Sequence, residues 1–417
     1  MRLLFFSNEF PNPVQPTKSV FNRQLAYALA ADHDVRAIVP VPWVDELRAG
    51  KSKRFDIVDG IETYYPRFYY TPRFGREHFS WWLWHSIRST AERLFKTWRP
   101  DAVIGYWAHP DGEVAVRLAH GLGVPGIVMV AGSDVLILMK KSRRLRDAIR
   151  RGLATADAIV SVSRDMRDFL VDAGLAPERI HVFDQGVDAS KFFPGNRAEA
   201  RRRLGLKTDG RHLVWVGRMV DVKGLDILIE ACALLKRRGE SFRLHLVGDG
   251  SLRKTLEAQV ATLGLNDVVD FAGAQPHGSL PDWYRSADLT VMPSRSEGIP
   301  NVLRESLACG TPFVASRVGG IPELAIGLEA ICRLVPAENP LALADALALA
   351  LKSCDPHPGG VLGVSPSWTE SAAVLVRLIE GLRNENDAKV RDHFVAPQPN
   401  GDNSNVPNTS AVPLGPR

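Results

Sequence analysis

The feature that most restricts how this chain can fold is a regular alternation of short apolar segments with helical ones. In the first half, the apolar segments have the length of buried strands, and a helix around Ser19–Ala31 joins the first two. Strands that are separated by helices form parallel sheets with right-handed crossovers. We therefore predict a Rossmann-like domain with strands at Leu3–Ser7, Val35–Val39, Ala102–Tyr106, Gly126–Val130 and Ala158–Val162.

The same alternation starts again in the second half. The segment from Arg179 to Asn196 has the proline and glycine residues that are typical of a linker between domains. Beyond it we predict strands at His212–Val216, Leu244–Val247, Val268–Phe271 and Leu289–Met292, and helices at Leu225–Arg238, Leu252–Leu263 and Pro281–Ser286. The predicted fold class is α/β, with two doubly wound Rossmann-like domains and a cleft between them.

The predicted domain boundaries follow from these patterns. Residues 1–190 form the first domain and residues 191–367 the second. Ser367 reads as the cap of a C-terminal helix over 368–386, and the polar residues 387–417 are expected to be a disordered tail.

Composition excludes several classes of protein. The four cysteines (Cys232, Cys309, Cys332 and Cys354) have neither disulfide nor metal-site spacing, so we expect reduced thiols in a cytoplasmic protein and no metal site. The first apolar run is too short for a signal peptide, and no run approaches the roughly 20 apolar residues of a spanning helix. The net charge of +5 is compatible with anionic nucleotides, a negatively charged bilayer surface or nothing specific.

The segment from Ser294 to Gly320 carries the strongest chemical signal. Two carboxylates eight residues apart, Glu297 and Glu305, flank the start of a helix that is expected to run from Asn301 to Gly310, so both are predicted to face one cleft. The start of a helix is suited to binding phosphate, and Glu305 can accept hydrogen bonds from the vicinal hydroxyls of a ribose. Nucleotide-sugar chemistry needs both functions.

Two further strand-to-helix turns are predicted at the same edge of the second sheet. Gly217 lets the backbone turn closely after a strand, and Arg218 and Lys223 place two cations where a diphosphate can sit, although such a pair is often solvated surface. Gly248 and Gly250 either satisfy turn geometry or line the same cleft.

In the first domain, polar residues follow two predicted strands. His109 comes after the strand that ends at Tyr106, and Asp134 comes after the strand that ends at Val130. A histidine at such a place is often a structural residue, but the carboxyl ends of parallel strands face ligands. We therefore take His109 and Asp134 as candidates that face the cleft.

A tryptophan-rich helix from Phe79 to Trp98 and a basic one from Lys140 to Arg151 permit two interpretations. Aromatic and basic residues on a helix can lie in a bilayer interface, or the helices can simply pack on their own sheet. The charge is also compatible with nucleic acid, but no recognisable nucleic-acid module accompanies it.

The order of the second-domain motifs resembles that of retaining glycosyltransferases of family 4, two-domain enzymes of the GT-B fold. The resemblance rests on Gly217-Arg218, Lys223-Gly224, Gly248-Asp249-Gly250, Glu297-Gly298, Pro300-Asn301, Glu305, Gly310-Thr311-Pro312, Gly319-Gly320 and Pro322-Glu323. Pro110-Asp111-Gly112, Gly132-Ser133-Asp134 and Gly186-Val187-Asp188 extend it into the first domain, so that it covers about residues 1–325.

The resemblance implies roles for these residues. Arg218 and Lys223 would hold the diphosphate of a nucleotide-sugar donor, Glu305 its ribose, and Glu297 would lie near its sugar. The implied catalytic group is Glu297, Arg218, Lys223 and His109, and the implied donor-binding set is Gly217, Arg218, Lys223, Gly248, Gly250, Glu297, Gly298, Ile299, Pro300, Asn301, Val302 and Glu305. The last helix would cross back to the first domain.

Two of the places where the sequence departs from the family lie at the expected cleft side of the first domain. The family commonly has a glycine-rich loop after the first strand, where this chain has Pro16-Thr17-Lys18-Ser19-Val20, so Lys18 joins His109 and Asp134 as an acceptor-side candidate. Many relatives also have their first-domain histidine nearer the position of Tyr106 than that of His109.

The function predicted from these observations is transfer of a sugar from a nucleoside-diphosphate sugar to an acceptor hydroxyl, with retention and without a metal or other cofactor. The expected acceptor is a carbohydrate or a lipid-linked glycan of exopolysaccharide, lipopolysaccharide or glycolipid synthesis, with an anionic membrane surface as a further partner. A nucleotide-sugar epimerase of the same fold and a non-catalytic nucleotide-sugar-binding relative are the alternatives.

Overall fold

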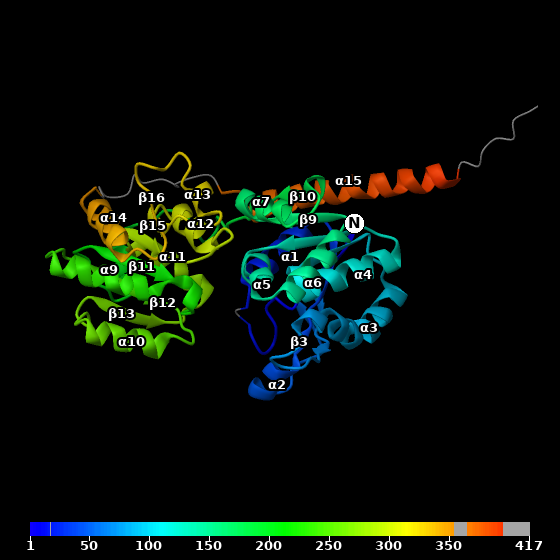
Figure 1. Ribbon diagram of the computed structural model, residues 1–417, viewed down its shortest axis with the longest axis horizontal. Coiled ribbons are helices and arrows are strands. Elements are labelled where there is room, and N and C mark those ends of the chain that lie inside the picture. The colour runs from blue at the N-terminus through cyan, green and yellow to red at the C-terminus, as the bar shows by residue number, and fades with distance from the viewer. Residues whose placement is uncertain (17, 354–364, 395–417) are drawn as a thin grey trace, which may run out of the picture.

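A computed structural model describes residues 1–16, 18–353 and 365–394, which form two α/β domains side by side (Figure 1). The first domain is built on an eight-stranded sheet, and the second on a six-stranded sheet. Every strand pair is parallel except β4–β5, an antiparallel hairpin at the edge of the first sheet. The predicted fold class, two Rossmann-like domains, is therefore confirmed.

The first sheet has β1 at its centre and parallel neighbours on both sides. Its order is β10 (Ile180–Val182), β9 (Ala158–Ser161), β8 (Gly126–Val130), β7 (Ala102–Tyr106), β1 (Arg2–Phe6), β2 (Asp34–Ile38), β5 (Ile61–Tyr64) and β4 (Phe55–Val58). Its helices are α1 (Val20–Ala30), α2 (Trp43–Ala49), α3 (Phe79–Thr97), α4 (Glu113–Leu122), α5 (Leu138–Lys141), α6 (Arg143–Ala154) and α7 (Arg164–Asp172). A small parallel pair, β3 (Val41–Pro42) and β6 (Arg67–Phe68), lies beside it.

The second sheet reverses strand order at β11, as a doubly wound sheet does. Its order is β13 (Val269–Gly273), β12 (Arg243–Val247), β11 (His212–Val216), β14 (Leu289–Met292), β15 (Phe313–Ser316) and β16 (Arg333–Val335). Its helices are α8 (Arg197–Arg203), α9 (Leu225–Arg237), α10 (Arg253–Thr262), α11 (Leu280–Ser286), α12 (Asn301–Ala308), α13 (Ile321–Leu324) and α14 (Pro340–Ser353).

The central strands were predictable because they are buried on both faces. All five residues of β7, β8 and β11 are buried, and such strands appear in a sequence as continuous apolar runs. The β4–β5 hairpin was not predicted. Its residues alternate between exposed and half-buried positions in β4, so that it carries no continuous apolar run.

The C-terminal helix α15 (Trp368–Phe394) returns to the first domain and lies along α1 (Figure 1). Trp368, Ala372, Leu375 and Ile379 are buried in the core that covers β1 and β7. The helix extends beyond the predicted end at residue 386, because the residues after Asn384 are polar but contain no proline before Pro397. The rest of the predicted tail, 395–417, lies outside the described residues.

The two domains are joined by the linker after β10 and by the segment before α15, which pair with each other. Val187 and Ser367 form a parallel bridge. Side chains also connect the domains: Arg304 lies 3.1 Å from the Asp184 carboxylate, and Glu323 accepts a hydrogen bond of 2.9 Å from the backbone N–H of Arg164. These contacts hold the carboxyl ends of the two sheets opposite each other.

Among the described residues, no helix combines the length and the apolar character needed to cross a bilayer. Cys232, Cys309 and Cys332 are free and buried, whereas Cys354 lies outside the described part of the chain.

Candidate functional site

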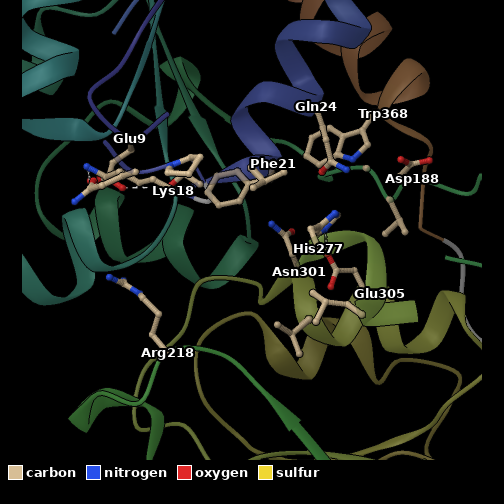
Figure 2. Close-up of a pocket in the computed structure, with 18 of the residues that line it drawn as sticks. Glu9, Lys18, Phe21, Gln24, Asp188, Arg218, His277, Asn301, Glu305 and Trp368 are labelled. Carbon is tan, nitrogen blue, oxygen red and sulfur yellow. Dashed lines mark hydrogen bonds and ion pairs between the residues drawn. The ribbon is translucent and has the colours of Figure 1, made fainter. Parts of the chain in front are cut away.

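A cavity of about 960 Å³ lies between the two domains (Figure 2). Loops at the carboxyl ends of β1, β7 and β8 and the first turns of α1 form one wall, and loops after β11 and β13 together with α12 form the other. Residues of both domains line it, among them Glu9, Lys18, Phe21, Gln24, Trp107, Ser133, Arg218, His277, Asn301, Val302, Glu305 and Trp368. This is the crevice in which α/β sheets of this kind bind ligands.

Arg218 extends into this cavity from the loop after β11 (Figure 2). The neighbouring loop after β12 holds it in place, because the backbone N–H of Met219 donates a hydrogen bond of 2.8 Å to the Asp249 carbonyl. Within the described part of the chain, the Arg218 guanidinium makes no hydrogen bond or ion pair, and its side chain is exposed. An exposed and unpaired guanidinium in a cleft is available for an anion.

Gly217, Gly248 and Gly250 were predicted to bind a donor, but they do not line the cavity. A side chain on Gly250 would meet the Met219 backbone within 3 Å, and one on Gly248 would meet the Gly217 carbonyl oxygen. These glycines allow the two strand-to-helix turns to pack against each other, which is the turn-geometry interpretation. Their effect on the cavity is to position Arg218.

Glu305 lies in α12 and faces the cavity together with Asn301 and Val302 (Figure 2). Its Oε2 atom accepts a hydrogen bond of 2.8 Å from the Tyr284 hydroxyl, and its Oε1 atom lies 3.1 Å from Nε2 of His277. The helix begins at Asn301 as predicted and ends at Ala308, just before Gly310, whose φ of +81° stops it.

Glu297 does not share the cavity wall with Glu305, although the sequence predicted one cleft for both. Its Oε1 atom lies 2.6 Å from the Lys223 ammonium and accepts a second hydrogen bond of 2.6 Å from the Ser294 hydroxyl. The two loops meet at Gly224, where a Cβ atom would lie 2.1 Å from the Pro293 carbonyl oxygen. Lys223 and Glu297 therefore form an ion pair beside the cavity.

The Gly298–Pro300 segment, predicted to bind the donor, packs against the first domain. A side chain on Gly298 would lie 2.2 Å from the Ala131 carbonyl oxygen and would press on Val162, so this close approach requires glycine. Asn301 and Val302 line the cavity, whereas Gly298, Ile299 and Pro300 do not, and their contact with a donor stays a prediction. The loop is thus a contact between domains.

Lys18 lies at the cavity, in the segment that replaces a glycine-rich loop (Figure 2). Its ammonium is 3.0 Å from the Glu9 carboxylate, which also accepts a hydrogen bond of 3.0 Å from the Ser19 hydroxyl. Ser19 has a φ of +45°, a left-handed conformation in which glycine is favoured. The loop therefore keeps a left-handed backbone conformation of the kind that glycine adopts, but it carries the charged side chain of Lys18.

His109 does not face the cavity, contrary to the prediction. The chain after β7 forms a one-turn helix (Ala108–Gly112) packed among α3, α4 and α6, and this turns the imidazole inward. His109 is 4% exposed, and its Nε2 atom lies 2.7 Å from the Arg76 carbonyl oxygen. The residue of this loop that lines the cavity is Trp107.

Asp134 is also turned away from the cavity. It is completely buried and accepts hydrogen bonds from the backbone N–H groups of Gly132, Ala131 and Ala108. Burial raises its pKa, and the three N–H groups oppose that rise. Asp134 therefore fixes the conformation of its loop, in which the preceding residue, Ser133, lines the cavity.

Sequence reasoning missed several lining residues. His277 follows β13 in a loop with no glycine-rich or charged motif, and Phe21 and Gln24 lie on a helix with no other signal than their spacing of three. Trp368 lies at the start of α15, far away in the sequence. Only Trp107 had a signal, because it directly follows a predicted strand. Among the described residues, no group of three His, Cys, Asp or Glu side chains lies close enough together to hold a metal ion.

Two family models match most of the chain. Residues 19–186 match the glycosyl transferase 4-like domain, and residues 196–357 match glycosyl transferases group 1. A D-inositol 3-phosphate glycosyltransferase of Acidothermus cellulolyticus is 37% identical over 52% of this chain and 52% of its own length. This chain thus spans about half of that relative. A putative teichuronic acid biosynthesis glycosyltransferase, TuaC of Bacillus subtilis, is 28% identical over 78% of this chain and 83% of its own length.

Solved structures show the same fold at low identity. A sucrose-phosphate synthase from Thermosynechococcus elongatus has a TM-score of 0.72 at 19% identity, over 94% of this chain and 99% of its own. HepE from Anabaena, solved with UDP-glucose, has a TM-score of 0.66 at 16% identity, over 94% of this chain and 100% of its own.

Proposed function

This chain belongs to the glycosyltransferase group 1 family, and from that premise we propose that it transfers a sugar from a nucleoside-diphosphate sugar to an acceptor hydroxyl. One observation carries the proposal. Arg218, whose guanidinium has no partner among the described residues, and the carboxylate Glu305 line the same cavity from the same domain. A guanidinium suits a diphosphate and a carboxylate suits the hydroxyls of a ribose, so the pair supports binding of one such donor.

The cavity has room for an acceptor opposite this donor site. Its first-domain wall offers the Trp107 ring, the Ser133 hydroxyl and the Lys18–Glu9 pair. Trp107 has a φ of +91°, which is rare and costly for a bulky residue and which places its side chain at the cavity. An aromatic ring beside hydroxyl and charged groups suits a sugar, and the name of TuaC favours a polysaccharide acceptor.

We further propose that transfer proceeds with retention, by attack on the same face of the donor sugar. Glu297 has Lys223 and Ser294 as partners, and Glu305 has His277 and Tyr284, and the proposal assigns neither carboxylate as a nucleophile or general acid. We propose instead that Arg218 and Lys223 stabilise the charge of the leaving diphosphate and that the departing phosphate oxygen takes the acceptor proton. This scheme assigns no step to a metal ion.

A donor panel tests the function. We expect one or two of UDP-, GDP-, ADP- and dTDP-sugars to raise the unfolding temperature of the purified protein, since a ligand at a hundred times its Kd stabilises by about 2.7 kcal/mol. Addition of a polysaccharide-type acceptor should then release the nucleoside diphosphate. Isomerisation of the free donor would indicate an epimerase, binding without turnover a non-catalytic relative, and no response to any nucleotide would overturn the proposal.

Association with an anionic membrane is the second part of the proposal, and it depends on a small surface at the start of α3. Of the four tryptophans in the segment Phe79–Trp98, only Trp81 is exposed, at 53%; the Trp98 indole donates to Asp34, and the Arg117 guanidinium covers Trp84. Helix α3 therefore packs mostly on its own sheet. Phe74, in the segment that precedes the helix, is a second exposed aromatic residue, at 77%.

Vesicle binding checks this second part. Changing Trp81 and Phe74 together to alanine should lower co-sedimentation with phosphatidylglycerol vesicles at least several-fold, because both rings lose their place in the bilayer interface. The matched control is Leu341→Ala, which removes an equally exposed apolar side chain from the second domain. Equal sedimentation of the wild type and the double variant would contradict membrane association through this surface.

A further inference from the structure

The Glu305 carboxylate is held in one orientation by two donors that lie on different elements. The Tyr284 hydroxyl, on α11, donates to Oε2 at 2.8 Å, and Nε2 of His277, in the loop after β13, lies 3.1 Å from Oε1. A carboxylate only accepts hydrogen bonds, so His277 must carry its proton on Nε2. Each carboxylate oxygen is thereby engaged by one protein donor.

Packing restrains both donors, Tyr284 more than His277. Tyr284 is completely buried, and its backbone carbonyl accepts a hydrogen bond of 2.7 Å from the Thr311 hydroxyl. The Phe192 ring, which comes from the linker between the domains, lies 5.2 Å from the His277 ring and 6.1 Å from the Tyr284 ring. Packing thus holds Tyr284 on all sides, whereas the His277 side chain is 25% exposed and is contacted on one side by Phe192.

One lone pair on each oxygen of Glu305 remains after these two hydrogen bonds, and the carboxylate faces the cavity. Two adjacent acceptors of fixed orientation match two vicinal hydroxyls, whereas a freely rotating carboxylate would lose entropy on binding them. The protein donors therefore decide how well the carboxylate is prepared for a diol.

We propose that His277 and Tyr284 are positioning residues that orient Glu305 for both ribose hydroxyls of the donor. The inference rests on the proposed function, because it assumes that the donor carries a ribose. The two residues should therefore matter more for a ribonucleotide than for one that lacks the 2′-hydroxyl, because the deoxynucleotide offers Glu305 only the 3′-hydroxyl.

Calorimetric titration with paired probes tests this difference. The probes are UDP, GDP and ADP, each with its 2′-deoxy analogue, on the full chain. For the nucleotide pair that binds, His277→Ala and Tyr284→Phe should each raise the Kd of the ribonucleotide about tenfold. The Kd of the deoxynucleotide should rise less than about threefold. His277→Gln should restore binding, because its amide N–H lies near the position of Nε2. In a Glu305→Ala background, His277→Ala should add no further loss.

The matched control is His120→Ala. His120 pairs with the Asp157 carboxylate at the same Nε2 to oxygen distance, 3.1 Å, but in the first domain and away from the cavity, so nucleotide binding should not change. Equal weakening of ribo- and deoxynucleotide by His277→Ala and Tyr284→Phe would overturn the inference, as would no weakening of either. Failure of the wild type to bind any of the six nucleotides would also overturn the inference, whereas the proposed function is decided separately by the donor panel, which includes dTDP-sugars.

Discussion

Replacement of Arg218 by alanine is expected to lower kcat/KM of sugar transfer by about a hundred- to a thousandfold. The guanidinium enters the cavity from the loop after β11 and, in the described part of the chain, has no competing carboxylate. In the proposed reaction, negative charge develops on the leaving diphosphate, and a cation that is held ready at that place lowers the barrier without reorganisation. Steady-state release of the nucleoside diphosphate measures the loss.

The fold should tolerate this change. Because Arg218 is exposed and unpaired among the described residues, Arg218→Ala should change the free energy of unfolding by no more than about 0.5 kcal/mol. Arg253→Ala is the matched control, since Arg253 begins the helix after the neighbouring strand and pairs with Glu257 outside the cavity. Transfer at the wild-type rate by Arg218→Ala, or an equal loss in the control, would contradict the assignment.

The second large effect is expected at the Lys223–Glu297 ion pair. Lys223→Ala and Glu297→Gln should each lower kcat/KM about a hundredfold, and the double variant should lose far less than the product of the two. The reason is geometric: Nζ and Oε1 are 2.6 Å apart, so Glu297 orients the Lys223 ammonium that is proposed to stabilise the leaving diphosphate, and the two changes remove either that cation or its orientation. A double-mutant cycle on transfer kinetics provides the coupling free energy.

Stability measurements separate this role from a purely structural one. The Glu297 carboxylate is partly exposed and has Lys223 and Ser294 as its partners. Lys223→Ala removes one of these partners and should therefore lower the free energy of unfolding. Lys236→Ala removes a surface pair with Asp267 and controls for the loss of a lysine. If the cycle showed coupling in the free energy of unfolding but none in kcat/KM, the pair would hold the loops together without acting on the donor.

The sequence predicted the carboxyl ends of the strands well, because they depend on local properties. Arg218 and Glu305 were chosen from a strand end and a helix start, and both line the cavity. The same rule selected His109 and Asp134, which lie at the correct edge of the first sheet but point into the protein. A strand end determines where a residue lies, whereas the direction of its side chain depends on the loops that pack around it.

The lining residues that were not predicted from the sequence also depend on how loops pack. His277 carries no motif, and it reaches Glu305 only because the loop after β13 lies beside α12. Glycines that are typical of phosphate-binding turns, such as Gly298, proved to serve the contact between domains. A pattern of residue types does not distinguish a glycine that approaches a ligand from one that approaches another loop.

The sequence by itself determined the two α/β domains, the central parallel strands of their sheets and the family, because strand burial on both faces and the spacing of turns are properties of neighbouring residues. The tertiary structure alone decided which side chains share the cavity: Glu305 with Arg218, Lys18, Trp107 and His277, but not Glu297 or His109. The physical reason is that the cavity wall is assembled from segments far apart in the chain. Which segments meet there depends on close contacts such as that of Gly298 with Ala131, which no local pattern of residues predicts.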